Sequence, residues 1–267
     1  MVETAKRQAM RIAICFFCAA LFGCGGEWES AAVGKTSCEF RNFNEFKPIK
    51  MSVSGDNLYF LDNFSKVHSY KYLYECYYDL QDTYPFDGFP SDVFAGGAGF
   101  YVQDRAQLRF MDDVLACEAR DGVFAINGNE LAVGSDMGIE IWSIKPCAKT
   151  GSVPSRKTLA LAATGSEYYA VEENALVMYS KTGSTINSEL LLGEKKICSA
   201  DRIIANNFGV YILDKKCRKI GVFDNYAVWQ RNMDLDFAPL DIAPAEHQYI
   251  FVLRAGGVEK MNVFIGK

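Results

Sequence analysis

Short apolar runs alternate with polar turn residues along most of the chain, and one phrase of this pattern occurs six times. Each copy has a turn marked by Gly or Asn, a β-type run, a second turn that is usually acidic, and a further β-type run. Runs rich in Val, Ile, Tyr and Phe between Gly, Asn and Asp favour strands, and no stretch keeps a helical apolar period for long. The pattern predicts an all-β protein, with copies of the phrase at 52–62, 92–104, 125–136, 162–173, 205–214 and 243–254.

Aligned on the residue that closes the first run of each phrase, the copies are 42, 32, 36, 42 and 40 residues apart. Each copy predicts three strands joined by tight turns, and the residues between copies suffice for a fourth. Repeats of roughly 20 to 50 residues indicate units that cannot bury their apolar faces alone and must stack on one another. The units resemble the four-stranded antiparallel blades of a β-propeller.

The third copy carries the most specific part of this resemblance. Residues 134–142 read GSDMGIEIW, which is similar to the GS-D-G-x-I-x-I-W segment of a WD-repeat blade. The Gly-His and Trp-Asp dipeptides of true WD repeats are missing. The resemblance therefore implies WD-like or quinoprotein-like blades, and not membership of the WD-repeat family.

The last unit ends close to the end of the sequence, with room for three strands but not for four. The segment 36–43, which reads TSCEFRNF, is expected to supply the missing outer strand. Such pairing would close a six-bladed β-propeller over residues 36–267, as a single domain without an open sheet edge. An open two-sheet β-sandwich is the alternative fold.

The first residues predict an export signal rather than part of the fold. Lys6, Arg7 and Arg11 precede an apolar stretch at 12–23, the layout of a secretory signal at 1–23. This stretch is shorter than the roughly 20 apolar residues that a membrane-spanning helix needs. A helix that starts the folded domain is the structural alternative.

The signal ends in Leu-Phe-Gly before Cys24, which resembles a bacterial lipoprotein signal. The resemblance implies lipid on Cys24, a tether at 24–35, and a cell-envelope location, as an outer-membrane lipoprotein facing the periplasm or the exterior. A secreted protein without lipid is the alternative. Loss of residues 1–23 removes three positive charges and Glu3, so the formal net charge falls from −5 to −7. Because nucleic-acid binding depends on clustered Lys and Arg, this acidity argues against a nucleic-acid partner.

Six cysteines remain after Cys24, and an even number in an exported protein permits disulfides. A hairpin that turns at 207–208 pairs residues whose numbers sum to 415, as those of Cys198 and Cys217 do. Directly opposed residues lie within disulfide range, so this bond is predicted. The other four permit three pairings that remain open, and reduced, buried cysteines are the alternative: Cys38, Cys76, Cys117 and Cys147.

Few residues suggest catalytic, metal or cofactor chemistry, so no catalytic residue, metal ligand or cofactor is predicted. His68 and His247 are far apart and form no HExxH or HxH pattern, and the six cysteines that follow Cys24 include no CxxC pair. Acidic side chains close five of the phrases and are expected to stabilise their own turns. On separate units they are too far apart to share one cation: Asp62, Asp104, Asp136, Glu172 and Asp214.

Two segments are candidates for recognition. The connection at 72–89 is rich in aromatic residues, which dominate interface hot spots, although outer-strand packing explains part of this content. Its candidate residues are Tyr74, Tyr77, Tyr84 and Phe86. The second segment is basic and would meet an acidic partner or lipid headgroups, unless it is only a solvated turn. Its candidate residues are Lys215, Lys216 and Arg218.

Two functions follow from this pattern. The first is a non-catalytic protein-interaction or scaffold module at the cell envelope, which binds a protein or an envelope component. The second is a metal-dependent propeller hydrolase or lactonase whose ligands lie on the inner strands around a central channel. Asp201 and Asp241 are the acidic residues predicted near the entrances of those strands.

Overall fold

The computed structural model of the protein describes residues 34–96, 99–111, 114–246 and 248–263. The strands described below all belong to one unit, Lys35–Lys267. The predicted signal at 1–23, the lipidation site Cys24 and His247 lie outside the described residues. In the described part of the chain, no helix has the length and apolar character needed to cross a membrane.

Four antiparallel sheets of four strands each follow one another along the chain. They come from the second to the fifth repeat units. The sheet of the second unit consists of β6 (Asp92–Gly96), β7 (Gly99–Asp104), β8 (Gln107–Phe110) and β9 (Val114–Glu118). The sheet of the third unit consists of β10 (Val123–Asn127), β11 (Glu130–Ser135), β12 (Gly138–Ser143) and β13 (Ala148–Val153). The sheet of the fourth unit consists of β14 (Thr158–Ala163), β15 (Glu167–Glu172), β16 (Ala175–Ser180) and β17 (Thr185–Leu190). The sheet of the fifth unit consists of β18 (Arg202–Asn206), β19 (Gly209–Asp214), β20 (Lys219–Phe223) and β21 (Trp229–Asp234).

The first and last repeat units share a fifth, eight-stranded sheet in the order β2-β3-β4-β5-β1-β24-β23-β22. Its first half consists of β2 (Pro48–Ser54), β3 (Asn57–Asp62), β4 (Lys66–Tyr74) and β5 (Tyr77–Pro85). Its second half consists of β22 (Pro239–Pro244), β23 (Tyr249–Arg254), β24 (Gly257–Asn262) and β1 (Lys35–Phe40). Two short 3-10 helices, η1 (Phe43–Glu45) and η2 (Gly193–Lys195), lie in connections.

The strand β1 joins the two halves of this sheet. It pairs antiparallel with β24, from Lys35↔Met261 to Cys38↔Val258. It also pairs in parallel with β5 through Glu39↔Tyr77 and Phe40↔Tyr78. The predicted pairing of the N-terminal segment with the last unit is therefore present. Because β1 bonds to both neighbours, hydrogen bonds group the described strands into five sheets, and a count of six blades does not follow from the sheets alone.

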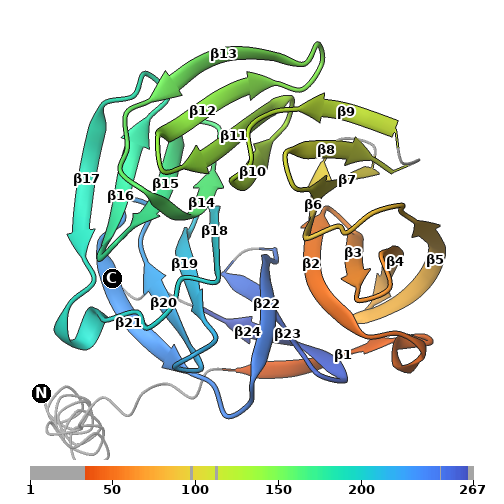
Figure 1. The fold of residues 1–267 in the computed structure, drawn as a ribbon. Coiled ribbons are helices and arrows are strands. Elements are labelled where there is room, and N and C mark those ends of the chain that lie inside the picture. Colours follow the sequence, from red (N-terminus) through yellow and green to blue (C-terminus); the bar gives the residue numbers. More distant parts are fainter. Residues whose placement is uncertain (1–33, 97–98, 112–113, 247, 264–267) are drawn as a thin grey trace, which may run out of the picture. The chain divides into compact units, whose positions relative to one another are not determined.

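The sheets surround a centre in a propeller-like arrangement, not in the alternative two-sheet sandwich (Figure 1). The innermost strands contact one another in the order β2, β6, β10, β14, β18, β22 and back to β2. Each sheet buries both faces against its neighbours, so its central strands are apolar on both faces; the six residues of β19 are all buried. This double burial explains why the apolar runs of the sequence are nearly continuous.

Three disulfides link the described cysteines. The predicted Cys198–Cys217 bond is present, with the two Cα atoms 5.9 Å apart. The hairpin of β18 and β19 has the expected register, in which Arg202 pairs with Leu213. The pairings that the sequence left open are Cys38–Cys76 and Cys117–Cys147.

Candidate functional site

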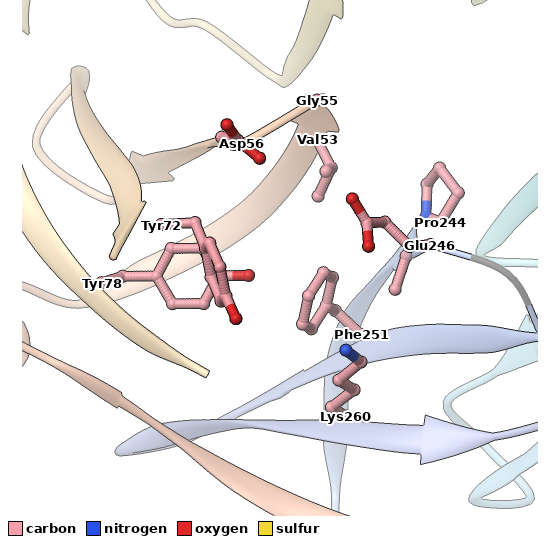
Figure 2. Close-up of a pocket in the computed structure, with 10 residues that line it drawn as sticks. Val53, Gly55, Asp56, Tyr72, Tyr78, Pro244, Glu246, Phe251 and Lys260 are labelled. Atoms are coloured by element: carbon pink, nitrogen blue, oxygen red, sulfur yellow. The ribbon is translucent and has the colours of Figure 1, made fainter. Parts of the chain in front are cut away.

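A groove between the first and last repeat units is one candidate binding site (Figure 2). Its cavity has a volume of about 270 Å³. Tyr72 and Tyr78 from β4 and β5 line one side, and Phe251 from β23 lines the other. The charged residues of the lining are Asp56, Glu246 and Lys260.

The aromatic residues of this groove are fixed by strand pairing. Tyr72 and Tyr78 are cross-strand partners, and their rings are 5.5 Å apart in an edge arrangement. The ring of Tyr78 also stacks on Phe40 of β1 at 4.9 Å and meets Phe251 at 6.2 Å. Tyr78 is 4% exposed, whereas Tyr72 is 39% exposed. The groove thus has a rigid aromatic floor with one accessible ring.

The electrostatics of the groove favour a donor or a cation as its ligand. Burial raises the pKa of Tyr78, and Tyr72, Glu246 and Asp56 raise it further, so its phenol stays protonated. The carboxylates of Asp56 and Glu246 are exposed. The ammonium group of Lys260 lies 5.0 Å from the centre of the Tyr249 ring. The groove therefore carries more negative than positive charge, and its aromatic faces also attract cations. Its one ammonium group already contacts a ring.

The predicted aromatic candidates separate into two pairs. Tyr74 and Tyr77 stack at 5.4 Å, and Tyr74 is 61% exposed, so they form a surface beside the groove. Tyr84 and Phe86 instead pack on Phe100, with ring centres 5.2 and 5.9 Å away. Phe86 is buried and Tyr84 is partly buried, so their contacts belong to the core between neighbouring units.

The predicted basic candidates lie in the turn between β19 and β20. Lys216 and Arg218 are exposed, whereas Lys215 is partly buried. The backbone N–H of Lys215 donates to Asp201 Oδ2 at 2.9 Å. Burial lowers the pKa of the Lys215 ammonium group, and the charge of Lys50 lowers it further. Lys215 therefore differs from Lys216 and Arg218 in being partly buried.

Two of the acidic residues that close the phrases, Asp62 and Asp214, stabilise their own turns. Asp62 Oδ1 accepts hydrogen bonds from the N–H groups of Phe64 and Lys66, at 2.8 and 2.9 Å. Asp214 Oδ1 accepts the N–H of Cys217 at 2.9 Å. These contacts match the turn role predicted from the sequence.

A second candidate site lies at one end of the innermost strands. Five of these six strands have one position that pairs with the residue just before the phrase-closing residue, and we call it the channel position. Four copies carry a charged side chain at this position, and the fourth copy carries an alanine. The pairs are Lys50↔Leu61, Asp92↔Gln103, Ala160↔Val171, Arg202↔Leu213 and Asp241↔Leu253.

The four charged residues at the channel position form one ion-pair network. Arg202 pairs through Nη1 with Asp92 Oδ2, and its Nε lies 3.8 Å from Asp241 Oδ1. Lys50 Nζ lies 3.9 Å from the same oxygen of Asp92. Asp241 is fully buried, and its Oδ2 accepts the Met51 N–H at 2.8 Å. One carboxylate oxygen is therefore shared by two cations.

Sequence reasoning missed Lys50, Asp92 and Arg202 and placed only Asp201 and Asp241 near the entrances. Each charge stands alone in its strand, and Arg202 and Asp92 are 110 positions apart. The register of the repeats would have revealed them. Each of them, like Asp241, pairs with the residue that precedes the closing residue of its own repeat.

The channel carboxylates do not fit a divalent cation. Calcium needs six to eight oxygen ligands, and zinc needs a set of free ligand atoms around one point. Asp92 is neutralised by Arg202 and Lys50, and Asp241 is held by a backbone N–H beside the same guanidinium group. Cys198, Cys217 and Asp214 also lie close together, but the two sulfur atoms are bonded to each other. The geometry therefore gives no support to the metal-dependent hydrolase.

The sheets and the two sites define a β-propeller-like protein with an aromatic groove and a charged channel mouth. Neither a protein-family model nor a curated protein matches its sequence.

Solved structures share the fold at low sequence identity. BamB from Moraxella catarrhalis is 10% identical, over 88% of this chain and 90% of that chain, with a TM-score of 0.54. A streptogramin B lyase is 12% identical, over 86% and 97% of the two chains, with a TM-score of 0.59. A chain of the mitotic checkpoint complex is 10% identical, over 79% and 72%, with a TM-score of 0.56. At these identities the similarity shows the fold alone.

Proposed function

We propose that the protein is a non-catalytic, six-bladed β-propeller that binds a protein partner or an envelope component at the bacterial cell envelope. Six inner strands contact one another in closed order, which supports six blades. The halves of the eight-stranded sheet meet through only two parallel residue pairs, so each half counts as a blade. In this proposal β1 closes the ring as the outer strand of the last blade.

The proposed location rests on the disulfides and on the N-terminal signal. Three disulfides in the described residues favour an oxidising compartment outside the cytosol. Lipid on Cys24, followed by a short tether, would hold the propeller at the outer membrane. A Cys24→Ala variant tests this step: the protein should leave the membrane fraction, and continued sedimentation with membranes would count against the anchor.

The groove between the first and last units is the observation that carries the binding role. It combines an accessible Tyr72 ring with a buried aromatic floor, and the stacked Tyr74 and Tyr77 lie on the same hairpin. Aromatic anchors that fill pockets supply most of the binding energy at protein interfaces. Since Asp56 and Glu246 outnumber Lys260, the best partner segment would place a Lys or Arg side chain in the groove.

One solved structure with this fold supports such a role by analogy: it is a chain of the mitotic checkpoint complex, which is an assembly of proteins. The streptogramin B lyase shows that the same fold also serves enzymes. Fold alone therefore does not decide between the classes, and the proposal depends on the groove.

The experiment compares variants for the recovery of one cross-linked partner. The full-length protein is cross-linked in cells, purified from solubilised envelope, and its partners are identified by mass spectrometry. Tyr72→Ala should lower recovery of the specific partner at least tenfold. Tyr226→Ala is the matched control, because Tyr226 is 64% exposed and lies in the turn between β20 and β21, outside the groove lining. Equal loss in both variants, or loss in neither, would contradict the proposed groove.

A direct assay separates the binding module from the hydrolase. The purified protein with added calcium or zinc should not hydrolyse lactones or esters above the background rate. Turnover that requires the metal and disappears in an Asp241→Asn variant would overturn the non-catalytic proposal.

A further inference from the structure

The hairpin of β4 and β5 ends in apolar side chains that reach solvent. These two strands are the longest among the described residues, with nine residues each. The residues 71–75 are all exposed. They include Leu73 and Tyr74, which are 50% and 61% exposed, and the ring of Tyr77 stacks on Tyr74 at 5.4 Å. We call residues 73–77 the hairpin tip. Adjacent exposed apolar side chains of this kind mark contact surfaces.

The tip is held to the closing strand β1. Cys76 forms a disulfide with Cys38 of β1, and the N–H of Glu39 donates to the carbonyl oxygen of Cys76 at 3.0 Å. Glu75 and Cys76 both have a positive φ, 41° and 65°, so these two residues reverse the chain between the strands. The apolar side chains of the tip are therefore presented on a braced hairpin, which limits the entropy lost when they bind.

The tip points to the side of the domain at which β1 begins. β1 and β5 pair in parallel through Glu39↔Tyr77, so both strands lead back from this pair in the same direction. On β5 that direction leads to the turn at 75–76, and on β1 it leads to Lys35. The Cα atoms of Cys38 and Cys76 are 4.8 Å apart, and about 10 Å of strand separates Cys38 from Lys35. The tip and the start of β1 therefore lie close together.

The proposed lipid anchor joins the domain at this same side. Cys24 precedes Lys35 by 11 positions in the sequence. An extended chain of this length reaches about 40 Å at most, so lipid on Cys24 would hold the start of β1 within that distance of the bilayer. The tip lies beside the start of β1 and would be held at the bilayer with it. Because a short tether gives a high effective concentration, a weak contact between the tip and lipid suffices.

We propose that Leu73 and Tyr74 insert into the interfacial layer of the lipid bilayer that carries the anchor. This contact rests on the proposed lipidation of Cys24. Tyrosine favours this layer because its ring is apolar while its hydroxyl group bonds to water or headgroups. The charged residues of 71–75 are Lys71 and Glu75, whose charges cancel, so the contact is apolar and does not require anionic lipid.

The tip and the groove have separate roles in this arrangement. Tyr72 lies in the groove beside Tyr78, and neither residue belongs to the tip (Figure 2). Membrane attachment is stable when two signals act together, here the lipid and the tip. The tip thus fixes the orientation of the domain on the membrane, and the groove stays available for the proposed protein partner.

The experiment measures whether the tip enters the bilayer. The full-length, lipidated protein is reconstituted into phosphatidylcholine vesicles whose acyl chains carry bromine near the headgroup, because bromine quenches tryptophan fluorescence at short range. Tyr74→Trp places the probe at the tip. All variants also carry Trp28→Phe, because Trp28 lies between Cys24 and β1 in the sequence. The signal of Trp142 and Trp229 is common to all variants and is subtracted.

Phe64→Trp is the matched control, because Phe64 is 67% exposed and precedes β4, whereas Tyr74 ends it. The two probes are therefore about 30 Å apart along one strand. The tip probe should be quenched at least threefold more than the control probe. Adding Leu73→Glu to the tip probe should remove most of this difference, because it places a charge in the apolar contact. The midpoint of thermal unfolding should not change, since Leu73 is half exposed.

Flotation of the vesicles separates failure of the anchor from failure of the tip. Protein that does not float refutes the lipid anchor and, with it, the tip contact. Protein that floats but shows equal quenching of both probes, or quenching that Leu73→Glu leaves unchanged, refutes the tip contact alone. An unquenched tip whose Leu73→Glu variant loses the cross-linked partner would assign the tip to the protein interface, which also overturns the proposal.

Discussion

The Cys38–Cys76 disulfide is expected to contribute strongly to stability, because it ties the closing strand β1 to the turn between β4 and β5. The two cysteines are 38 positions apart, and both are buried in the core of the first and last units. In the chain-entropy model, a loop of this length stabilises the folded state by about 3.9 kcal/mol at 25 °C. That value is a large share of the roughly 5 to 15 kcal/mol that typically holds a domain together.

The assay is urea unfolding of a Cys38→Ala/Cys76→Ala double variant, with native-state amide exchange measured on the same protein. The free energy of unfolding should fall by about 4 kcal/mol. The amides of β1 should also exchange faster than those of β19, because β1 loses its covalent tie to the turn between β4 and β5 and keeps only its pairing with β24 and two residue pairs with β5. A loss of global stability without faster exchange in β1 would indicate that the disulfide does not hold β1 in the eight-stranded sheet.

The matched control removes Cys117 and Cys147, which are 30 positions apart and away from β1. The same model predicts a loss of about 3.7 kcal/mol, nearly equal to the first. The two double variants should therefore differ mainly in β1 exchange and little in total stability. If the first variant loses less than about 1 kcal/mol, or if both variants open β1 equally, the reasoning is refuted.

Three further predictions concern charged residues. Arg202→Met should lower stability by about 3 to 5 kcal/mol in urea unfolding, because it leaves Asp241 buried without a cation; adding Asp241→Asn should restore part of the loss. The folded-state pKa of Lys215 is lowered, so the unfolded chain binds more protons and stability should rise with pH from that folded value up to about 10.4, the ordinary pKa of lysine. Thermal unfolding of Lys215→Gln across this range should lack that rise. Asp62→Ala should cost about 1 to 3 kcal/mol, measured in the same way, because it removes two backbone hydrogen bonds in the turn. An unchanged melting temperature would contradict the turn role.

The strands and one disulfide could be predicted because both depend on local signals. Turn residues at fixed offsets identify a hairpin, and a hairpin sets its own register. The Cys198–Cys217 bond followed from that register alone, and Arg202↔Leu213 confirms the alignment. The two halves of the eight-stranded sheet were not foreseeable, because the parallel contact of β1 with β5 involves only two residue pairs.

The roles of the aromatic residues could be predicted only in part. In a propeller both faces of a strand are buried, so alternation does not tell a core tyrosine from an exposed one. The ladder between β4 and β5 also shifts register between Tyr72 and Tyr74. This shift leaves Tyr74 stacked on Tyr77 at the end of the hairpin, while Tyr72 pairs with Tyr78 in the groove.

The channel position shows how repetition and function are related in this chain. The closing acids are shared by five copies, and two of them, Asp62 and Asp214, stabilise their own turns, so they belong to the scaffold. One pairing step earlier the copies diverge: Lys50, Asp92, Arg202 and Asp241 are charged, and Ala160 is small. An ion-pair network needs different residues at equivalent positions, because identical charges would repel one another around the channel. Divergence at a fixed register, rather than the repeated residues, is therefore the signal that marks the channel mouth as a candidate site.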